Sequence, residues 1–467
     1  MISTLNDIDG LGVTVMGLGL HGGGLAASRF FAEHGATVTV TDLRDEATLA
    51  PTVEKLADLP IRFVLGRHEK EDFSEADLVI KNPAVPRNSK YLQLADRIET
   101  DISVFLRLNQ RPVLAITGSK GKSTSVSALH RILRAADPEA LLGGNITVSP
   151  LTFVEKCLLP SESPVILELS SWQLADIKPA ELLKARIAAI TNIMPDHQNS
   201  YSSMQEYVND KARIFAGQAA DEYSICFYDD EYGRFFAEST PGRPLFYSAA
   251  PLPEELGDGA YLHDGIGYLR RGGQLQEIVP ELVNIAGTHN KLNLLVAAAS
   301  AALWGVPLDT IRAEAAGFSG IEHRMELVRE LNGVRWYNDS AATIPDATAA
   351  AIKSLSGNVH LITGGTDKKL DFSPLDEVLE LPASIHLLEG SASIHMQKKM
   401  QVRQIPYYGP FGNLQAAIFS AFEQATAGDT VLFSPGATSF GMFLNEFDRG
   451  RSFKSMVAQL PPKLTAS

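Results

Sequence analysis

The chain has 467 residues, enough for two or three domains that each bury a core of their own. With 45% apolar and 21% charged residues it has the composition of an ordinary soluble globular protein, and its net charge of −14 argues against nucleic acid or an anionic membrane as a partner. The two cysteines, Cys157 and Cys226, are too few for a disulfide scaffold or a cysteine metal site, which favours a reducing compartment.

The first hundred residues alternate strand-like and helix-like segments. The apolar patterns predict strands at 12–16, 36–41, 61–65 and 78–80 and a helix at 24–33. Such alternation is typical of a parallel sheet covered by helices. We therefore predict a Rossmann-like domain over residues 1–100.

A glycine-rich turn joins the first predicted strand to the first predicted helix. It reads Gly17-Leu-Gly-Leu-His-Gly22, and Asp42 follows Gly22 by twenty residues, the distance at which an acid meets a ribose in dinucleotide folds. Three interpretations remain open at this point: an NAD site, a site for another nucleoside diphosphate whose pyrophosphate lies over the turn, and a turn without a ligand. Nothing local separates them.

A second glycine loop occupies residues 114–124, Leu-Ala-Ile-Thr-Gly-Ser-Lys-Gly-Lys-Ser-Thr. The pattern predicts a strand, a loop that aims backbone N–H groups at one point, and a helix that includes 126–133, an arrangement that suits a phosphate. Lys122 adds a positive charge, and Ser123 or Thr124 offers a hydroxyl ligand for Mg²⁺. The motif is a shorter variant of the general phosphate loop, because Ile116 stands where that loop has glycine.

Charged and polar side chains follow two further predicted strands of this second cycle. Glu168 lies at the end of strand 165–169, and strand 188–193 leads to Asp196 and His197. Ligands of parallel sheets bind at the carboxyl edge, where the phosphate loop also lies. A carboxylate there is well placed to hold a Mg²⁺ that bridges ATP and a second substrate. His197 alone would read as a surface residue, but the convergence of three strand ends favours a site.

The rest of the second cycle contains a helical segment at 204–214, whose Lys211 reads by itself as a solvated helix lysine. Residues 224–279 predict short, glycine-containing strands in a small antiparallel addition, and 290–304 a closing helix. We place the next boundary near residue 320, so that a central P-loop-type ATPase α/β domain covers residues 101–320. The longest nearly apolar run, 292–304, is too short to span a bilayer, and the N-terminus lacks a signal pattern, so we expect a cytoplasmic protein.

A third α/β cycle follows from Arg335. Its predicted strands are 359–363, 384–388 and 430–434. This pattern predicts a C-terminal Rossmann-like domain over residues 321–467.

Ten motifs, in order along the chain, give it a resemblance to the Mur ligase family. They are TGSKGKST at 117–124, GGNI at 143–146, ELSSWQL at 168–174, NIMPDH at 192–197, EY-x3-K-x2-I around Lys211, AGTHNKLN at 286–293, EHR at 322–324, NDSAAT at 338–343, GGTDKK at 364–369 and SPGATSF at 434–440. In this family the first domain holds a UDP moiety, the second ATP and the third the incoming amino acid. The resemblance thus implies a UDP-sugar site, not an NAD site, at the first glycine turn.

The resemblance also implies roles for individual residues. The catalytic set would be Lys122, Glu168, His197 and Lys211, with Ser123, Glu168, His197 and Lys211 as ligands of two Mg²⁺ ions. ATP would be bound by Gly118, Ser119, Lys120, Gly121, Lys122, Ser123, Thr124, Asn290, Asn293, Arg324 and Asp339. The UDP substrate would meet Gly19, Leu20, His21, Asp42, Leu43, Arg44, Asn82 and Asn145, and the glutamate carboxylates Thr343, Lys368, Ser439 and Phe440.

Lys211 is implied to be carbamylated. The modification turns an ammonium into an anion that can face a metal, and it requires a desolvated lysine with a lowered pKa.

The implied reaction is an ATP-dependent ligation in cytoplasmic peptidoglycan precursor synthesis, and a monomer is expected. The carboxylate of UDP-MurNAc-L-Ala attacks the γ-phosphate of ATP, and the amine of glutamate then attacks the resulting acyl phosphate. Both reactants of the first step are anions, so two Mg²⁺ ions and Lys122 must offset their repulsion. Water would destroy the acyl phosphate, which gives a reason for domain closure before chemistry.

Several positions depart from the family pattern. Ala341 replaces a lysine in NDSKAT, and residues 196–201 lack the second acid and the arginine that usually follow the histidine. Gly441 and Glu446 stand where an aspartate and an aromatic residue are common, and Asn-Pro-Ala at 82–84 replaces Ser-Pro-Gly. These changes leave ATP activation intact and concern mainly the amino-acid pocket. D-glutamate is the predicted acceptor, with L-glutamate as the alternative.

Other readings fit less well. Folylpolyglutamate synthases share the ATP core but start near the phosphate loop, whereas about a hundred residues precede Thr117 here. The diaminopimelate-adding ligase carries a D-N-P-R motif that this chain lacks. An NAD-dependent oxidoreductase is favoured by the first glycine turn alone. A catalytically dead binding module is disfavoured because Lys122, Glu168, His197 and Lys211 are all present.

Overall fold

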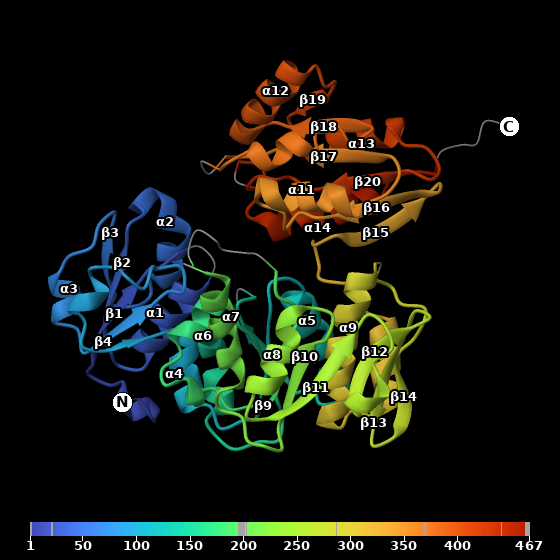
Figure 1. The fold of residues 1–467 in the computed structure, drawn as a ribbon. Coiled ribbons are helices and arrows are strands. Elements are labelled where there is room, and N and C mark those ends of the chain that lie inside the picture. Colours follow the sequence, from blue (N-terminus) through green and yellow to red (C-terminus); the bar gives the residue numbers. More distant parts are fainter. Residues whose placement is uncertain are drawn as a thin grey trace. The chain divides into compact units, whose positions relative to one another are not determined.

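The computed structural model describes residues 2–19, 22–146, 148–194, 201, 203–285, 287–367, 370–439 and 441–462. The chain divides into two compact units, Met1–Phe318 and Ser319–Ser467. In the described residues the first unit holds two sheets and the second unit one, each accompanied by helices (Figure 1). The predicted fold class, three α/β domains, is confirmed.

The first sheet has the strand order β3-β2-β1-β4-β5, and all its pairings are parallel. The strands are β1 (Gly12–Met16), β2 (Thr37–Asp42), β3 (Arg62–Leu65), β4 (Leu78–Lys81) and β5 (Ile98–Glu99), and the helices α1 (Gly23–Glu33), α2 (Glu46–Val53) and α3 (Glu71–Ser74). The order reverses direction between β1 and β4, and ligands of doubly wound sheets bind at such a switch point. The turn after β1 lies there.

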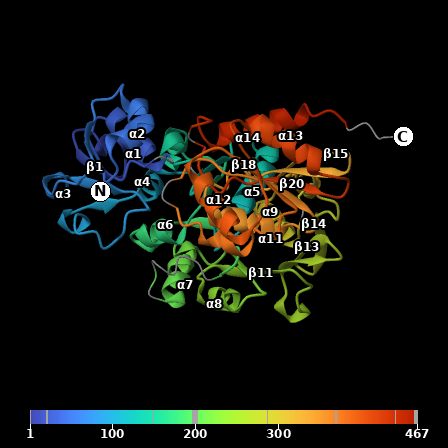
Figure 2. The same ribbon diagram turned by 90° about the horizontal axis from the view of Figure 1, so that it is seen from above.

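The second sheet has the order β14-β13-β12-β11-β10-β9-β6-β8-β7. Its strands are β6 (Val113–Thr117), β7 (Leu141–Gly144), β8 (Val165–Glu168), β9 (Ala185–Ile190), β10 (Tyr223–Phe227), β11 (Arg243–Ser248), β12 (Gly259–His263), β13 (Ile266–Arg271) and β14 (Gln274–Val279). Its helices are α4 (Asp101–Leu108), α5 (Lys122–Ala136), α6 (Ser171–Asp176), α7 (Met204–Ala212), α8 (Glu231–Ser239), α9 (Thr288–Trp304) and α10 (Leu308–Ala316). The helices α6 and α7 lie side by side (Figures 1 and 2).

The prediction of a small antiparallel unit over residues 224–279 is wrong for the first half of that range. β10, β11 and β12 pair in parallel and continue the central sheet, because α8 provides the crossover from β10 to β11. Antiparallel pairing begins only at β13 and β14. There the turns are tight: Asp264 and Gly265 both have positive φ, as two-residue hairpins require.

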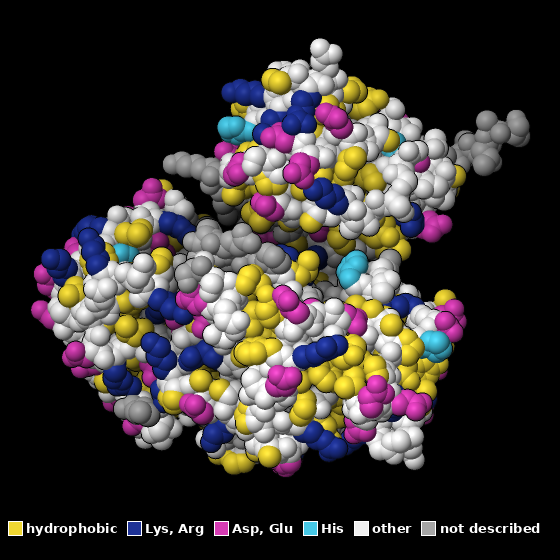
Figure 3. All heavy atoms as spheres, viewed as in Figure 1, with side chains coloured by type: hydrophobic (Ala, Val, Ile, Leu, Met, Phe, Trp, Pro, Cys, Tyr) yellow, Lys and Arg dark blue, Asp and Glu magenta, His cyan; other side chains and the backbone are white. Residues whose placement is uncertain are grey.

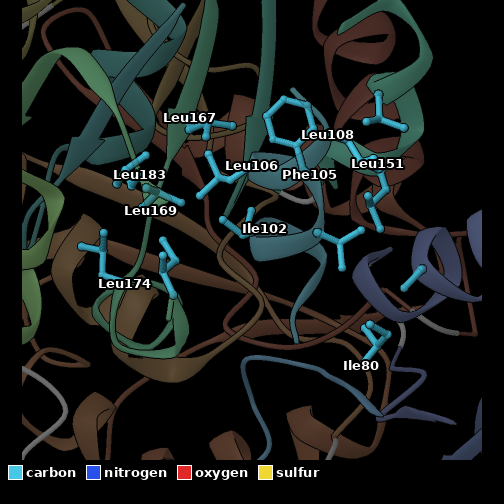
Figure 4. Packing of buried hydrophobic residues seen from close by; sticks show 14 of the residues in the cluster. Ile80, Ile102, Phe105, Leu106, Leu108, Leu151, Leu167, Leu169, Leu174 and Leu183 are labelled. Atoms are coloured by element: carbon cyan, nitrogen blue, oxygen red, sulfur yellow. The ribbon is translucent and has the colours of Figure 1, made fainter. Parts of the chain in front are cut away.

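One hydrophobic cluster joins the two sheets of the first unit. It includes Ile80 of β4, Ile102 and Phe105 of α4, Leu167 of β8 and Leu174 of α6, which Figure 4 shows converging around α4. The residues of α4 are almost all buried. Because a shared core resists relative movement, the first glycine turn and the phosphate loop belong to one packed body.

The second unit forms a sheet of order β15-β16-β20-β17-β18-β19, parallel except for the pair β15 and β16. The strands are β15 (Glu326–Leu331), β16 (Val334–Asn338), β17 (Val359–Thr363), β18 (Ser384–Leu388), β19 (Tyr408–Phe411) and β20 (Thr430–Phe433), and the helices α11 (Pro345–Ser354), α12 (Ser391–Arg403), α13 (Leu414–Gln424) and α14 (Glu446–Ala458). Two clusters of buried apolar side chains fill its core.

The surface carries charges of both signs. On the face of the first unit drawn in Figure 3, Lys and Arg side chains are interspersed with Asp and Glu. Among the described residues, no helix combines the length and the apolar character needed to cross a bilayer.

Candidate active site

The loop between β6 and α5 has the backbone of a phosphate site. Gly118 and Gly121 both have positive φ, and a Cβ on Gly121 would lie 2.2 Å from the Asn293 side-chain oxygen. The helix α5 begins at Lys122, so the N–H groups of its first turn point toward the loop. A helix N-terminus behind a glycine loop attracts an anion. Asn293, a predicted ATP residue, is thereby placed against this loop.

The side chains of the loop fold back onto its own backbone and onto the end of β9. The Lys122 Nζ donates to the carbonyls of Gly118 at 2.9 Å and Ser119 at 3.1 Å. The Ser119 hydroxyl is buried and donates to the carbonyl of Met194, and the Lys120 amide donates to the Asn192 side chain. Ser119 thus supports the loop through its side chain; its role as an ATP ligand stays a prediction, as do those of Ser123, Thr124 and Asn290.

Glu168 lies at the carboxyl end of β8, next to the end of β6. It is 1% exposed and pairs in register with Ile116, two residues before the loop. Its Oε1 accepts a 2.8 Å hydrogen bond from the Asn145 side-chain amide, whereas its Oε2 is buried and finds no hydrogen-bond partner among the described residues. A buried carboxylate oxygen without a donor is unfavourable by itself, and a cation beside it would remove that cost. Glu168 therefore fits the role of a metal ligand.

Lys211 is a buried lysine on α7. It is 1% exposed, and its Nζ donates to the Gly118 carbonyl at 2.8 Å and lies 4.6 Å from the centre of the Tyr207 ring. The interpretation of Lys211 as a solvated helix lysine is wrong, because α7 packs this face against the phosphate loop. Burial is the environment that carbamylation requires; the modification itself stays a prediction.

A cavity of about 320 Å³ brings several of the predicted residues together. Its wall includes Asn82, which follows β4 of the first sheet, and Asn145, Lys122 and Lys211, which lie after β7 and on α5 and α7 around the second sheet. Sequence reasoning missed further wall residues, namely Asp101, Ser149, Ser170, Trp172, Gln173 and Tyr207. Three of these belong to the ELSSWQL motif and one to the segment around Lys211, so the motifs contained the signal.

Asp101 had no signal in the sequence. It is the first residue of α4, and its carboxylate accepts hydrogen bonds from the Ser149 hydroxyl at 2.7 Å and the Ile102 amide at 2.9 Å. Burial raises the pKa of Asp101, and these hydrogen bonds act in the opposite direction. A carboxyl group therefore faces the cavity between the two glycine turns.

A second cavity, of about 510 Å³, lies over the first glycine turn. The predicted residues Gly19, Asp42, Leu43, Arg44 and Asn82 all line it, together with the unpredicted His68, Lys90 and Tyr91. The Asp42 carboxylate accepts hydrogen bonds from the backbone amides of Gly19 and Arg44, at 3.1 and 2.9 Å. Asp42 therefore ties two wall segments together. Leu20 and His21 lie outside the described residues.

The second unit holds the remaining predicted residues. Asp339 is buried at the end of β16, where its carboxylate accepts hydrogen bonds from the Ser434 hydroxyl at 2.7 Å and the Met325 amide at 3.1 Å. Burial raises its pKa to about 6. The charge of Arg324 acts against this rise. The roles of Arg324 and Asp339 toward adenosine stay predictions.

Two of the four residues predicted to bind the substrate glutamate lie among the described residues. Thr343 is half-buried just after β16, and Ser439 is buried, with its carbonyl accepting from the Phe443 amide at 3.1 Å. Ala341 donates its amide to the His323 carbonyl and contributes no charge. Lys368 and Phe440 lie outside the described residues, so the pocket stays a prediction.

The predicted metal site is described only in part. His197 lies outside the described residues, and among the residues that are described no group of three His, Cys, Asp or Glu side chains has the arrangement of a metal centre. Ser123 is the second residue of α5. Glu168 is the described carboxylate that fits a cation.

Three family models match the chain and together cover most of it. "Mur ligase MurD-like, N-terminal domain" matches residues 12–104, "Mur ligase middle domain" residues 116–301, and "Mur ligase, glutamate ligase domain" residues 323–436.

Several proteins named UDP-N-acetylmuramoylalanine–D-glutamate ligase are similar over nearly the whole length. The protein from Borreliella afzelii (strain PKo) is 41% identical, with 98% of this chain and 99% of that protein aligned. The protein from Roseiflexus sp. (strain RS-1) is 40% identical, with 95% and 97% aligned, and that from Treponema pallidum (strain Nichols) 39%, with 96% and 98%.

Solved structures share the fold at low identity. The UDP-N-acetylmuramate-alanine ligase MurC of Thermotoga maritima has a TM-score of 0.57 at 17% identity, with 96% of this chain and 99% of that one aligned. A bifunctional folylpolyglutamate synthase/dihydrofolate synthase has a TM-score of 0.52 at 15% identity, with 76% and 92% aligned.

Proposed function

Since the chain belongs to the Mur ligase family, we propose that it is the ATP-dependent ligase that joins D-glutamate to UDP-N-acetylmuramoyl-L-alanine in peptidoglycan precursor synthesis. The relatives named above support this substrate pair, because the similarity extends over all three domains. A match to the MurD-like N-terminal domain spans the first glycine turn and speaks against the NAD interpretation.

One observation of the geometry carries the proposal. The cavity over the first glycine turn and the cavity beside the phosphate loop share two wall residues, Asn82 and Ala84. A UDP-sugar whose diphosphate lies over the turn would pass these shared residues and extend its peptide carboxylate toward Lys122. Such a path is what a ligase needs and an ATPase without a second substrate does not.

The UDP end of the substrate would lie in the cavity of about 510 Å³. Asp42 holds the two walls of this cavity through backbone amides, which pre-organises the site before the substrate arrives. His68 and Tyr91, whose ring centres are 5.0 Å apart, offer an aromatic wall for a base.

The ATP phosphates would lie on the loop between β6 and α5. The Lys122 ammonium now rests on two loop carbonyls, and it would turn toward the γ-phosphate, where negative charge must be offset. The Asn293 side chain of α9 lies so close to Gly121 that a Cβ there would collide with it, so both the space and the positive φ require glycine at this position.

The chemistry of the donor set fits Mg²⁺. Glu168, with its unpaired carboxylate oxygen, and the Ser123 hydroxyl would hold one ion, and His197 with a carbamylated Lys211 a second. Bound Mg²⁺ supplies charge neutralisation and orientation of phosphate oxygens.

In the reaction, an oxygen of the substrate carboxylate forms a bond to the γ-phosphorus of ATP, and the bond to ADP breaks. The neutral amine of glutamate then attacks the acyl carbon, a proton leaves the nitrogen, and phosphate departs with the bonding electron pair. Asn145, which donates to Glu168 and lines the cavity, would orient the substrate carboxylate.

Glutamate would be received by Thr343, Lys368, Ser439 and Phe440. Because Ala341 removes one cation from this region, L-glutamate is kept as the second candidate. A monomer in the cytoplasm is proposed, since ATP and UDP-sugars are available there and one chain carries both cavities.

Phosphate release tests the proposal. With ATP, Mg²⁺ and UDP-N-acetylmuramoyl-L-alanine present, D-glutamate should stimulate phosphate release and L-glutamate should not. Equal stimulation by both would replace the D-specific assignment, and NADH binding with no dependence on ATP would overturn the ligase assignment.

A further inference from the structure

The loop after β4, residues 82–91, lines several cavities of the first unit. Val85, Pro86 and Asn88 line the cavity over the first glycine turn, and the same three residues line a third cavity of about 400 Å³ with Trp172 and Glu206 of the central domain. The loop is therefore the thin wall between the UDP site and the central domain.

Arg87 in this loop spans two helices of the central domain. Its Nη2 donates to the Asp210 carboxylate of α7 at 3.0 Å, and its Nε lies 3.4 Å from the Asp176 carboxylate at the end of α6. Asp176 also receives the Lys81 ammonium of β4 at 2.6 Å. Two cations from the first sheet and two carboxylates from the central domain thus form one network.

Ion pairs on an exposed surface stabilise a protein by only about 0 to 1 kcal/mol, so the burial of this network decides how strongly it holds the helices. Here both carboxylates are largely covered: the side chains of Asp176 and Asp210 are 9% and 14% exposed. Lys81 is 4% exposed, and its burial lowers its pKa while the Asp176 charge opposes this. Removing Arg87 would leave Lys81 beside Asp176 but would take this cation from the covered Asp210 carboxylate, which is costly.

The network ends beside the buried lysine. Asp210 directly precedes Lys211 on α7, and Lys211 is bonded to the Gly118 carbonyl of the phosphate loop. Two successive residues therefore hold α7: Asp210 pairs with Arg87 of the loop 82–91, and Lys211 donates to the phosphate loop.

We propose that Arg87 is a positioning residue for the ligation: by bridging Asp176 and Asp210 it fixes α7, and with it the Lys211 side chain, relative to the wall of the UDP site. The inference rests on the proposed function of Lys211. Arg87 touches neither Lys211 nor the phosphate loop in the described contacts, so it acts through the helix. Arginine suits this place, because its guanidinium donates to Asp210 through one nitrogen while another lies beside Asp176, whereas a lysine ammonium is a single point charge.

The experiment compares steady-state kinetics of R87Q and R87K with those of the unchanged enzyme, with UDP-N-acetylmuramoyl-L-alanine as the varied substrate. R87Q should lower kcat about tenfold or more, the scale of lost support behind a functional ligand, and should change KM much less. R87K should recover part of kcat. If kcat of R87Q stays within about twofold of the unchanged enzyme, the proposal is overturned.

A double-mutant comparison of kcat distinguishes a positioning role of Arg87 through Asp210 from a nonspecific loss of structure. If Arg87 acts through Asp210, R87Q/D210N should be no slower than the slower single variant, because both changes break one link. Independent, multiplying losses would contradict the proposal. R131Q is the matched control: Arg131 also pairs with a carboxylate, Glu314, at 2.6 Å and is 45% exposed against 42% for Arg87, and kcat should not change.

The inference and the proposed function can fail separately. K211A is measured in the same assay: an active K211A would remove the role of Lys211 and with it the basis for Arg87. An inactive K211A beside a fully active R87Q would overturn only the role of Arg87. Should R87Q not fold, R87K gives the same decision, since a partial loss of kcat supports the bridge and an unchanged kcat contradicts it.

Discussion

The two glycine turns of the first unit share a backbone design and differ in their charges. Each follows a parallel strand, β1 or β6, and opens a helix, α1 or α5, with glycines of positive φ at the bend. In the first turn none of the described residues, 17–19 and 22, is charged, and the Asp42 carboxylate accepts from a turn amide. The second turn carries Lys122 and lies against Lys211.

This difference indicates that a glycine turn followed by a helix suits phosphate binding in both places, and that the charges around it decide between binding alone and phosphoryl transfer. The described part of the first turn carries no cation itself and would bind a diphosphate through its N–H groups, with Arg44 and Lys90 in the wall of the same cavity. Transfer of a phosphoryl group needs positive charge where negative charge develops, and the second turn provides it. Loss of charge at the second turn should therefore abolish turnover, while changes at the first should weaken binding.

The largest effect is expected for Lys122→Ala. Removing this cation should lower kcat by about 100- to 1000-fold, on the scale of a lost transition-state contact. Affinity for the UDP-sugar, measured by calorimetry without ATP, should be unchanged, because that ligand lies over the other turn. Retained ligation at the normal rate would contradict the role of the loop.

Lys211→Ala should also lower turnover strongly, because it removes the group proposed to become a carbamate. Formate or acetate should restore part of the activity by placing a free carboxylate in the space that the side chain leaves. Activity is followed by phosphate release with and without the added acid. Absence of any rescue would argue against the carbamate.

Asp42→Asn tests the first turn. An asparagine keeps one acceptor oxygen, so one of the two amide hydrogen bonds, worth about 1 kcal/mol, is lost. KM for the UDP-sugar should rise several-fold with kcat nearly unchanged. The nearby Asp45→Asn is the control, since Asp45 caps α2 and asparagine caps equally well. A fall in kcat without a change in KM would contradict the division of roles.

The smallest effect concerns Asp101, whose carboxylate lies between the two turns, 3.8 Å from the position of a Cβ on Gly23. Its pKa is raised in the folded protein, so its contribution to stability is present below the unfolded pKa and is lost as pH rises through the folded value. Asp101→Asn keeps both hydrogen bonds, with Ser149 as acceptor. The unfolding midpoint of the unchanged protein, relative to that of the variant, should fall as pH rises from 4 to 8. Parallel curves would contradict this.

The sequence predicted the elements of strongly periodic segments well and tertiary arrangements less well. Strands 12–16 and 359–363 coincide with β1 and β17. The pairing direction of β10 and β11 could not be predicted from short glycine-containing runs, because it depends on the crossover through α8.

The candidate site shows the same division. Motifs indicated Lys122, Asn145 and Lys211, and these line one cavity. Asp101 could not be found from the sequence, because the fold alone brings it to the cavity wall. Arg87 had no signal either, since its carboxylate partner Asp210 lies 123 positions further along the chain.

The transfer of a phosphoryl group to the substrate carboxylate can be observed directly. UDP-N-acetylmuramoyl-L-alanine with a heavy isotope at both carboxylate oxygens is incubated with ATP, Mg²⁺ and D-glutamate, and the released phosphate is analysed by mass spectrometry. One heavy oxygen in each phosphate is predicted, because the acyl–oxygen bond breaks when the amine attacks. Release of unlabelled phosphate during ligation would contradict the proposed chemistry at the Lys122 loop.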